Sequence, residues 1–273
     1  MEKHIKCLIQ ACHNQGIAYE AMDKEQNVIR VKINDTWQYF QSARTPFNDQ
    51  AMAGLCLDKD HTYQILKNTV NMPKTVSFLD FNTDEKYQHY VKFKNITAII
   101  TEIENTFTYP VVIKKNKGGL GANVFLCHNR DEAMNAITVI FDRDSKHYDY
   151  VVLAQAFIPT VKEYRAVFYN RQLVLIYERM SGDSTTGFNC RYWETNKGFA
   201  KPVHDTVLKQ RISDFVQPIF DTIGINYVGF DLIIDENDEC HFIEMNSAPR
   251  YDHFIDHNGE TGVIQLFETI LTQ

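Results

Sequence analysis

The sequence predicts an α+β fold, and two features of its pattern support this prediction. Short runs rich in β-branched and aromatic residues follow one another with only a few turn residues between them, which is typical of hairpins. Segments with helical periodicity stand between groups of such runs and do not alternate with single strands, as they would in a doubly wound parallel sheet. With 273 residues, 44% of them hydrophobic, the chain is long enough for one large domain or for two or three compact lobes.

The amino-terminal part predicts a helix, a group of three strands, a second helix, a fourth strand and a polar helical stretch. An amphipathic helix is expected over residues 3–13, with an apolar face made by Ile5, Leu8, Ile9 and Cys12. Asp58 is the expected N-cap of a helix that continues to about residue 70, and Pro73 stops it. The further elements expected here are strands at residues 17–22, 27–33, 37–43 and 75–81 and a polar helical stretch at 84–95.

The rest of the chain predicts mainly hairpins. Strands are expected at residues 97–103, 109–115 and 122–128, followed by a helix at 131–140. Residues 150–158, 162–170 and 172–180 are expected to form three consecutive antiparallel strands. A long polar segment at 181–203 then leads to a helix at 206–223, strands at 227–235 and 240–246, and a last helix at 260–271.

Composition argues against several classes of partner and site. The chain has 28 basic and 35 acidic residues, a net charge of −7, which gives no general reason to expect nucleic acid or an anionic membrane as the partner. The start lacks the apolar core of a signal peptide, and no run approaches the ~18 apolar residues of a membrane span. Phe254 stands where the Glu of a H-E-x-x-H zinc motif would be, between His253 and His257. We therefore expect a cytoplasmic protein with reduced thiols at Cys7, Cys12, Cys56, Cys127, Cys190 and Cys240.

A glycine-rich loop lies between two of the expected strands. Gly118, Gly119 and Gly121 are not followed by the Lys-Ser or Lys-Thr of a P-loop, and the segment after them predicts a strand where a dinucleotide fingerprint needs a helix. The remaining interpretation is a hairpin whose backbone N–H groups can approach phosphate oxygens, with Lys114 and Lys115 just before it. The alternative is an ordinary hairpin with surface lysines.

Two carboxylates are expected to face each other on a second hairpin. If residues 236–239 form the turn, Asp231 lies directly opposite Glu244, and Asn246 points to the same face. Directly opposed acids repel unless something neutralises them, and an oxygen-only set of Asp, Glu and Asn suits Mg²⁺. The alternative is a solvated acidic edge, but the flanking apolar residues favour the metal site.

The order of these motifs is similar to that of the ATP-grasp superfamily from about residue 55 onward. The resemblance rests on Asp58-Lys59, Tyr109 to Lys114 and the glycine loop, Gln155 to Ile158, Glu163-Tyr164-Arg165, Arg179, Asp231, and Glu244 to Pro249. It implies two α+β lobes that grip ATP. We accordingly expect a short amino-terminal segment at 1–57 and an ATP-grasp domain at 58–273, with a lid at about 88–154 and a metal-binding lobe at about 155–273.

The resemblance also implies roles for individual residues. Magnesium ligands are implied at Asp231, Glu244 and Asn246, with Mn²⁺ as the alternative ion, and Arg179 matches an arginine near the γ-phosphate. The implied ATP contacts are Lys59 and Lys114, the glycines 118, 119 and 121, the adenine-reading residues Gln155, Ala156, Phe157 and Ile158, and the ribose ligand Glu163. Candidate substrate contacts are Arg191, Asn196, Arg250 and His253, for each of which a plain surface role is the alternative.

The implied activity is an ATP-dependent ligase that forms an amide bond through an acyl phosphate. The tail from Pro249 resembles cyanophycin synthetase and the ligase half of bifunctional glutathione synthetases. Amino acids or short peptides are the leading substrates, and a hydroxy acid or a natural-product precursor is the alternative, which the sequence leaves open. The sequence departs from the usual pattern of the ATP-grasp superfamily at two positions: Gln155 stands where many members carry Glu, and Arg250 stands where Gly is common. The alternatives are a kinase that stops at phosphoryl transfer and a catalytically silent ATP-binding module. A homodimer is a further expectation from the resemblance.

Overall fold

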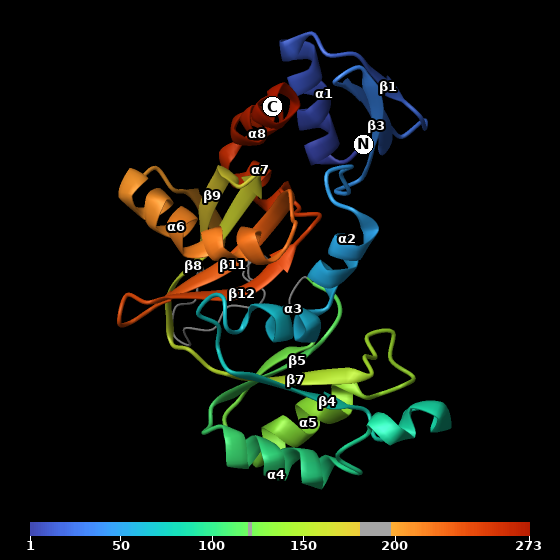
Figure 1. Ribbon diagram of the computed structural model, residues 1–273, viewed down its shortest axis with the longest axis vertical. Helices are drawn as coiled ribbons and strands as arrows, with labels where there is room; N and C mark the ends of the chain where they lie inside the picture. Colours follow the sequence, from blue (N-terminus) through green and yellow to red (C-terminus); the bar gives the residue numbers. More distant parts are fainter. Residues whose placement is uncertain (120–121, 181–197) are drawn as a thin grey trace.

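The computed structural model describes residues 1–119, 122–180 and 198–273, and its strands form three antiparallel sheets (Figure 1). The first has the order β1-β2-β3, with β1 (Tyr19–Ala21), β2 (Val28–Ile33) and β3 (Thr36–Gln41). The second has the order β4-β7-β5-β6, with β4 (Thr75–Leu79), β7 (Val151–Ala156), β5 (Val111–Lys115) and β6 (Val124–Cys127). The third has the order β10-β9-β8-β11-β12, with β10 (Phe199–Pro202), β9 (Gln172–Met180), β8 (Thr160–Tyr169), β11 (Tyr227–Asp235) and β12 (Cys240–Asn246). The predicted α+β class is confirmed.

The two ends of the chain pack together. Helix α1 (Lys3–Gln15) lies beside α8 (Thr261–Thr272), at the top of Figure 1. Both helices bury their apolar stripes in one core with the first sheet and with α7 (Asp252–Asn258). The sequence pattern predicted α1, α8 and the three strands, but not α7.

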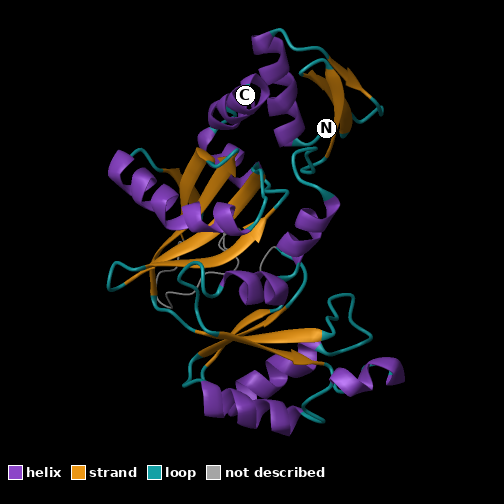
Figure 2. Ribbon diagram, viewed as in Figure 1, coloured by secondary structure: helices purple, strands orange, loops and turns teal. Residues whose placement is uncertain are grey.

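The second sheet is covered on one face by α4 (Ile96–Thr106) and α5 (Arg130–Ile140) (Figure 2). The predicted strand at 97–103 is wrong, because these residues belong to α4. The side chain of Asn95 accepts a hydrogen bond from the Ala98 N–H at 2.8 Å and caps the helix. Ile99, Ile100 and Ile103 are fully buried at helical spacing, so tertiary burial outweighs the strand preference of β-branched residues.

Strand β7 belongs to a different sheet from β8 and β9, which corrects the prediction of three consecutive antiparallel strands. It pairs with β4 on one side and β5 on the other, so its residues Val152, Leu153 and Ala154 are buried on both faces. Pro159 separates β7 from β8, and only β8 and β9 form the predicted hairpin.

The third sheet has one apolar face and one mixed face. Tyr164, Phe168, Phe230 and Leu232 alternate along β8 and β11 and pack under α6 (Thr206–Thr222), together with α2 (Gln50–Leu57) and α3 (Lys59–Leu66). On the opposite face one end is covered by α1, α7 and α8, while the other end carries charged side chains next to α3 and the second sheet.

Several boundaries differ from the prediction. Helix α3 has the predicted N-cap Asp58, whose side chain accepts the His61 N–H at 3.0 Å, but it ends at Leu66. The stretch at 84–95 contains a 3₁₀ helix, η1 (Glu85–Tyr90), and the pattern missed α2 and β10. In the described part of the chain no helix is both long and apolar enough to cross a membrane. The division of the chain near residue 57, and the lid and lobe boundaries, stay predictions.

Candidate active site

Asp231 and Glu244 face each other across β11 and β12, as the sequence predicted. The register pairs Asp231 with Glu244 and Gly229 with Asn246. Next to the turn the predicted register is wrong by one residue, because Ile234 pairs with Cys240 and not with His241. A β-bulge between Asp231 and Leu232 shifts the register back and gives the predicted pair. The expected face-sharing of Asp231, Glu244 and Asn246 follows from this pairing.

Asp231 is neutralised by two arginines that lie on the neighbouring strands. Arg165 is directly opposite Asp231 on β8 and binds its carboxylate with two donors, Nε to Oδ1 and Nη2 to Oδ2, the latter at 2.9 Å. Arg179 Nη1 lies 3.1 Å from Asp231 Oδ2 and donates to Glu163 at 2.8 Å. Burial would raise the pKa of Asp231, but the charges of Arg165 and Arg179 lower it to about 2. Asp231 therefore does not need a metal ion to neutralise it, since Arg165 and Arg179 already do so.

Glu244 and Asn246 are less occupied by protein contacts than Asp231, and so they are better able to bind a ligand. The Glu244 side chain is 25% exposed and lies 3.6 Å from the Lys59 ammonium. The buried Nδ2 of Asn246 has no hydrogen-bond partner among the residues that the structure describes. A buried amide without a partner is unusual, and its oxygen together with the carboxylates makes the hard, oxygen-only donor set that Mg²⁺ and Mn²⁺ accept.

Lys114 is buried in the second sheet and points at Gln155. Its ammonium donates to Gln155 Oε1 at 2.9 Å, and Gln155 Nε2 donates to Thr75 Oγ1 at 2.9 Å. Burial lowers the pKa of Lys114 to about 8; the charge of Lys59 adds to this effect, while that of Glu244 opposes it. Lys59, Lys114 and Glu244 therefore form one electrostatic group that spans the second and third sheets.

The glycine loop is a hairpin loop, as predicted, since β5 and β6 pair on either side of it. It is attached to the start of α3. Lys59 donates to Gly118 O at 2.7 Å and Asn116 O at 3.3 Å, and the Asp60 N–H donates to Asn116 Oδ1 at 2.9 Å. Gly118 has φ +106°, which favours glycine. Gly119 is exposed, and Gly121 lies outside the described residues.

The other predicted contacts are more dispersed. Ala156 ends β7 and its N–H donates to Lys74 O at 2.8 Å, and Phe157 and Ile158 follow in the connection to β8. Arg250 is exposed. His253 on α7 is half-buried and stacks edge-on against His257, with ring centres 4.4 Å apart; burial and then the charge of His257 lower the pKa of His253. Arg191 and Asn196 lie outside the described residues.

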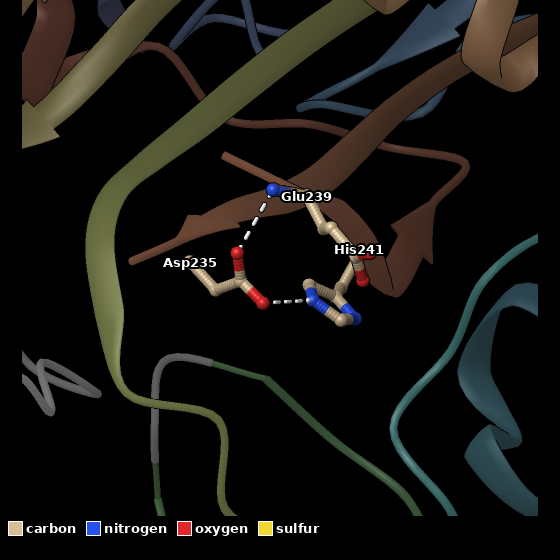
Figure 3. Close-up of side chains that lie close together, drawn as sticks. All are labelled: Asp235, Glu239 and His241. Atoms are coloured by element: carbon tan, nitrogen blue, oxygen red, sulfur yellow. Dashed lines mark hydrogen bonds and ion pairs between the residues drawn. The ribbon is translucent and has the colours of Figure 1, made fainter. Parts of the chain in front are cut away.

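A cluster of Asp235, Glu239 and His241 at the turn of the same hairpin has metal-like spacing among the described residues (Figure 3). Asp235 Oδ2 lies 3.0 Å from His241 Nε2, and Asp235 Oδ1 accepts the Glu239 N–H at 2.8 Å. His241 Nδ1 lies 3.1 Å from Asn71 Nδ2. Both ring nitrogens of His241 are thus used by the protein, so the cluster fixes the turn and does not offer a ready metal site.

Sequence reasoning assigned no role to Arg165, Asn116 or Gly229. Arg165 could have been found, because it is two residues from Glu163 on one strand and therefore shares its face. Asn116 and Gly229 act through contacts with residues far away in the sequence, and no local pattern marks them.

Known proteins resemble this chain over most of its length. The RimK-like ATP-grasp domain matches residues 59–270. The alpha-aminoadipate–LysW ligase LysX of Sulfurisphaera tokodaii is 23% identical over 76% of this chain and 65% of its own length. The D-alanine–D-alanine ligase of Haemophilus ducreyi is 20% identical over 55% of this chain and 48% of its own length. This chain thus spans less than two thirds of the length of these relatives.

Solved structures show the same fold at low identity. The bifunctional glutathione synthetase of Pasteurella multocida covers 99% of this chain with a TM-score of 0.56 at 15% identity, and 44% of that protein is matched. The D-alanine–D-alanine ligase of Bacillus anthracis, in a complex with ATP, covers 80% of this chain with a TM-score of 0.55 at 15% identity, and 65% of it is matched. Because the family's model matches far more than half of the chain, the chain belongs to the RimK-like ATP-grasp family.

Proposed function

We propose that this protein is an ATP-dependent ligase that joins a carboxylate to an amine through an acyl phosphate. One observation carries the proposal. Oxygen ligands on β11 and β12 lie close to cations from three other elements, at one place between two sheets. The oxygen ligands are Asp231, Glu244 and Asn246, and the cations are Lys59 on α3, Lys114 on β5 and Arg179 on β9. The relatives' names also share the word ligase, and one of the similar solved structures is a complex with ATP.

The proposed nucleotide site uses the glycine loop, Lys59 and Lys114 on the triphosphate and the segment from Gln155 to Ile158, with Glu163, on the nucleoside. Asp231, Glu244 and Asn246 would hold Mg²⁺, or Mn²⁺ in its place. A bound divalent ion supplies charge neutralisation for the phosphates. The protein's own cations would offset the remaining negative charge without needing to rearrange.

The proposed chemistry needs no nucleophilic side chain. A substrate carboxylate oxygen bonds to the γ-phosphorus and ADP leaves; the amine nitrogen then bonds to the acyl carbon, phosphate leaves, and the amine loses a proton. Arg179 is placed to stabilise the phosphoryl group, since it already binds two carboxylates in a mostly buried position. The glycine loop would limit the access of water to the acyl phosphate.

We propose amino acids or short peptides as substrates, supported by the relatives that act on α-aminoadipate and D-alanine. Arg250 and His253 would contact the substrate from the segment that follows β12. The cytoplasmic location and the homodimer stay predictions.

The test is ADP release from the purified protein with Mg-ATP and pooled amino acids and dipeptides, with products identified by mass. A product equal to two components minus water supports the ligase. A phosphorylated acceptor without condensation, or ATP binding without turnover on a broad panel, would contradict it. Glu244→Gln should lose the activity, while Glu236→Gln, exposed on the turn of the same hairpin, should keep it.

A further inference from the structure

Gly229 lies under the side chain of Arg165, in the strand that carries Asp231. A Cβ at Gly229 would stand 3.1 Å from Arg165 Cδ and 3.3 Å from its Nη1, and 2.9 Å from Pro249 Cβ. These distances are shorter than ordinary contacts. The absence of a side chain at Gly229 therefore makes a slot between Pro249 and the sheet, and the stem of Arg165 fills it.

The slot determines how Arg165 reaches Asp231. Gly229 and Asp231 are two residues apart on β11 and share a face, and Arg165 is the cross-strand neighbour of Asp231 on β8. With its stem in the slot, the guanidinium binds both carboxylate oxygens side-on. Such a two-bond contact fixes the plane of the carboxylate as well as its charge.

Arg165 and Asp231 are both enclosed by the protein. Its side chain is 8% exposed and that of Asp231 6%, whereas Glu244 beside them is 25% exposed. Arg179 differs, because it divides its contacts between Glu163 and Asp231. Because Asp231 accepts from both Nε and Nη2 of Arg165, we expect an effect of Arg165 on the reaction to pass through Asp231.

We propose that Arg165 and Gly229 are positioning residues, which hold the Asp231 carboxylate in one orientation so that it can bind a divalent cation together with Glu244 and Asn246. This inference rests on the proposed function, since it takes these three residues as the metal site. Outer contacts that orient a ligand commonly change metal affinity by about 10- to 100-fold when removed.

The experiment measures ADP affinity by calorimetry twice, once in EDTA and once with saturating Mn²⁺. The metal-dependent strengthening of ADP binding reports the metal site, while the affinity in EDTA reports the rest of the nucleotide site. In Gly229→Ala every charged group remains, but the new methyl group would stand 2.9 Å from Pro249 Cβ and 3.1 Å from Arg165 Cδ, so it presses the Arg165 stem out of the slot and also crowds Pro249. We expect the strengthening to fall about tenfold, with the affinity in EDTA unchanged.

Two further variants make the result independent of folding defects. Arg165→Lys adds nothing to the slot and keeps the charge, but an ammonium cannot bind both oxygens side-on, so it should also lose much of the strengthening. Gly224→Ala, with open space around its Cβ position, is the matched control and should behave as the wild type.

The outcomes separate this inference from the proposed function. If Glu244→Gln lowers the metal-dependent strengthening but Gly229→Ala and Arg165→Lys do not, the positioning role is wrong and the metal site stands. If Glu244→Gln and Asp231→Asn leave the metal-dependent strengthening of ADP binding unchanged as well, the proposed metal site is wrong, and the positioning role is then wrong too. A fall of ADP affinity in EDTA equal to that in Mn²⁺ would indicate a general structural defect and would also overturn the inference.

Discussion

The ammonium of Lys59 donates a 2.7 Å hydrogen bond to the carbonyl oxygen of Gly118 and lies 3.6 Å from the Glu244 carboxylate. One cation at the start of α3 thus contacts both the glycine loop and the candidate metal strand. The loop and the strand come from different sheets, so Lys59 links the two parts of the site.

Replacing Lys59 with Met should loosen the loop and weaken ADP binding. The change removes a charged hydrogen-bond donor, a contribution of about 1.5 kcal/mol or more, which corresponds to at least about a tenfold loss of affinity. Calorimetry measures the affinity, and trypsin cleavage after Lys117 should become faster. Lys67→Met, at the other end of the same helix, is the control, and equal affinities in the two variants would contradict the role of Lys59.

ADP affinity should fall as the pH rises through about 8. Lys114 has its pKa lowered to about 8 by burial, so its ammonium loses a proton above that value and no longer attracts phosphate. The affinity is full below the pKa and declines above it. Gln155→Glu places a carboxylate beside the ammonium, so the decline should move to higher pH. An identical pH profile in Gln155→Glu would assign the titration to another group.

Lys114 should also make folding stability depend on alkaline pH. Between about 8 and the ordinary value of 10.5 the unfolded chain holds a proton at Lys114 that the folded chain has released, so stability rises with pH in this window. Relative to Lys114→Met, the wild type should gain about 2 kcal/mol between pH 7 and pH 10. Urea unfolding of both proteins at each pH gives the difference, in which the titration of other groups cancels. A constant difference would contradict a lowered pKa.

Glu244→Gln and Asp231→Asn should both abolish turnover but differ in stability. The Asp231 carboxylate is enclosed by Arg165 and Arg179, and its loss leaves two arginines poorly compensated, at a cost of about 3–5 kcal/mol. The partly exposed Glu244 has one ion pair at 3.6 Å, so Glu244→Gln should cost about 1 kcal/mol or less. Thermal unfolding measures both changes in stability, and equal losses in the two variants would contradict this difference.

The hairpins could be predicted because their partners are close in sequence. The strands around the glycine loop and those carrying Asp231 and Glu244 are joined by short turns, so alternation and turn position determine which side chains face each other. The prediction failed for residues 97–103 and for β7. There, a helix buried under a sheet and a strand shared by two distant partners override local preference.

By itself, the sequence determined the α+β class and the order of the motifs, whereas the pairing of Asp231 with Glu244 also required the β-bulge in their hairpin. Only the tertiary structure decided what surrounds them. Arg165 reaches Asp231 across 66 residues, and Lys59 reaches Gly118 across 59. Contacts of this kind depend on which strands become neighbours in a sheet. The order of the strands is set by the burial of the whole apolar face of each sheet, to which residues from all parts of the chain contribute, and no local sequence pattern contains that total.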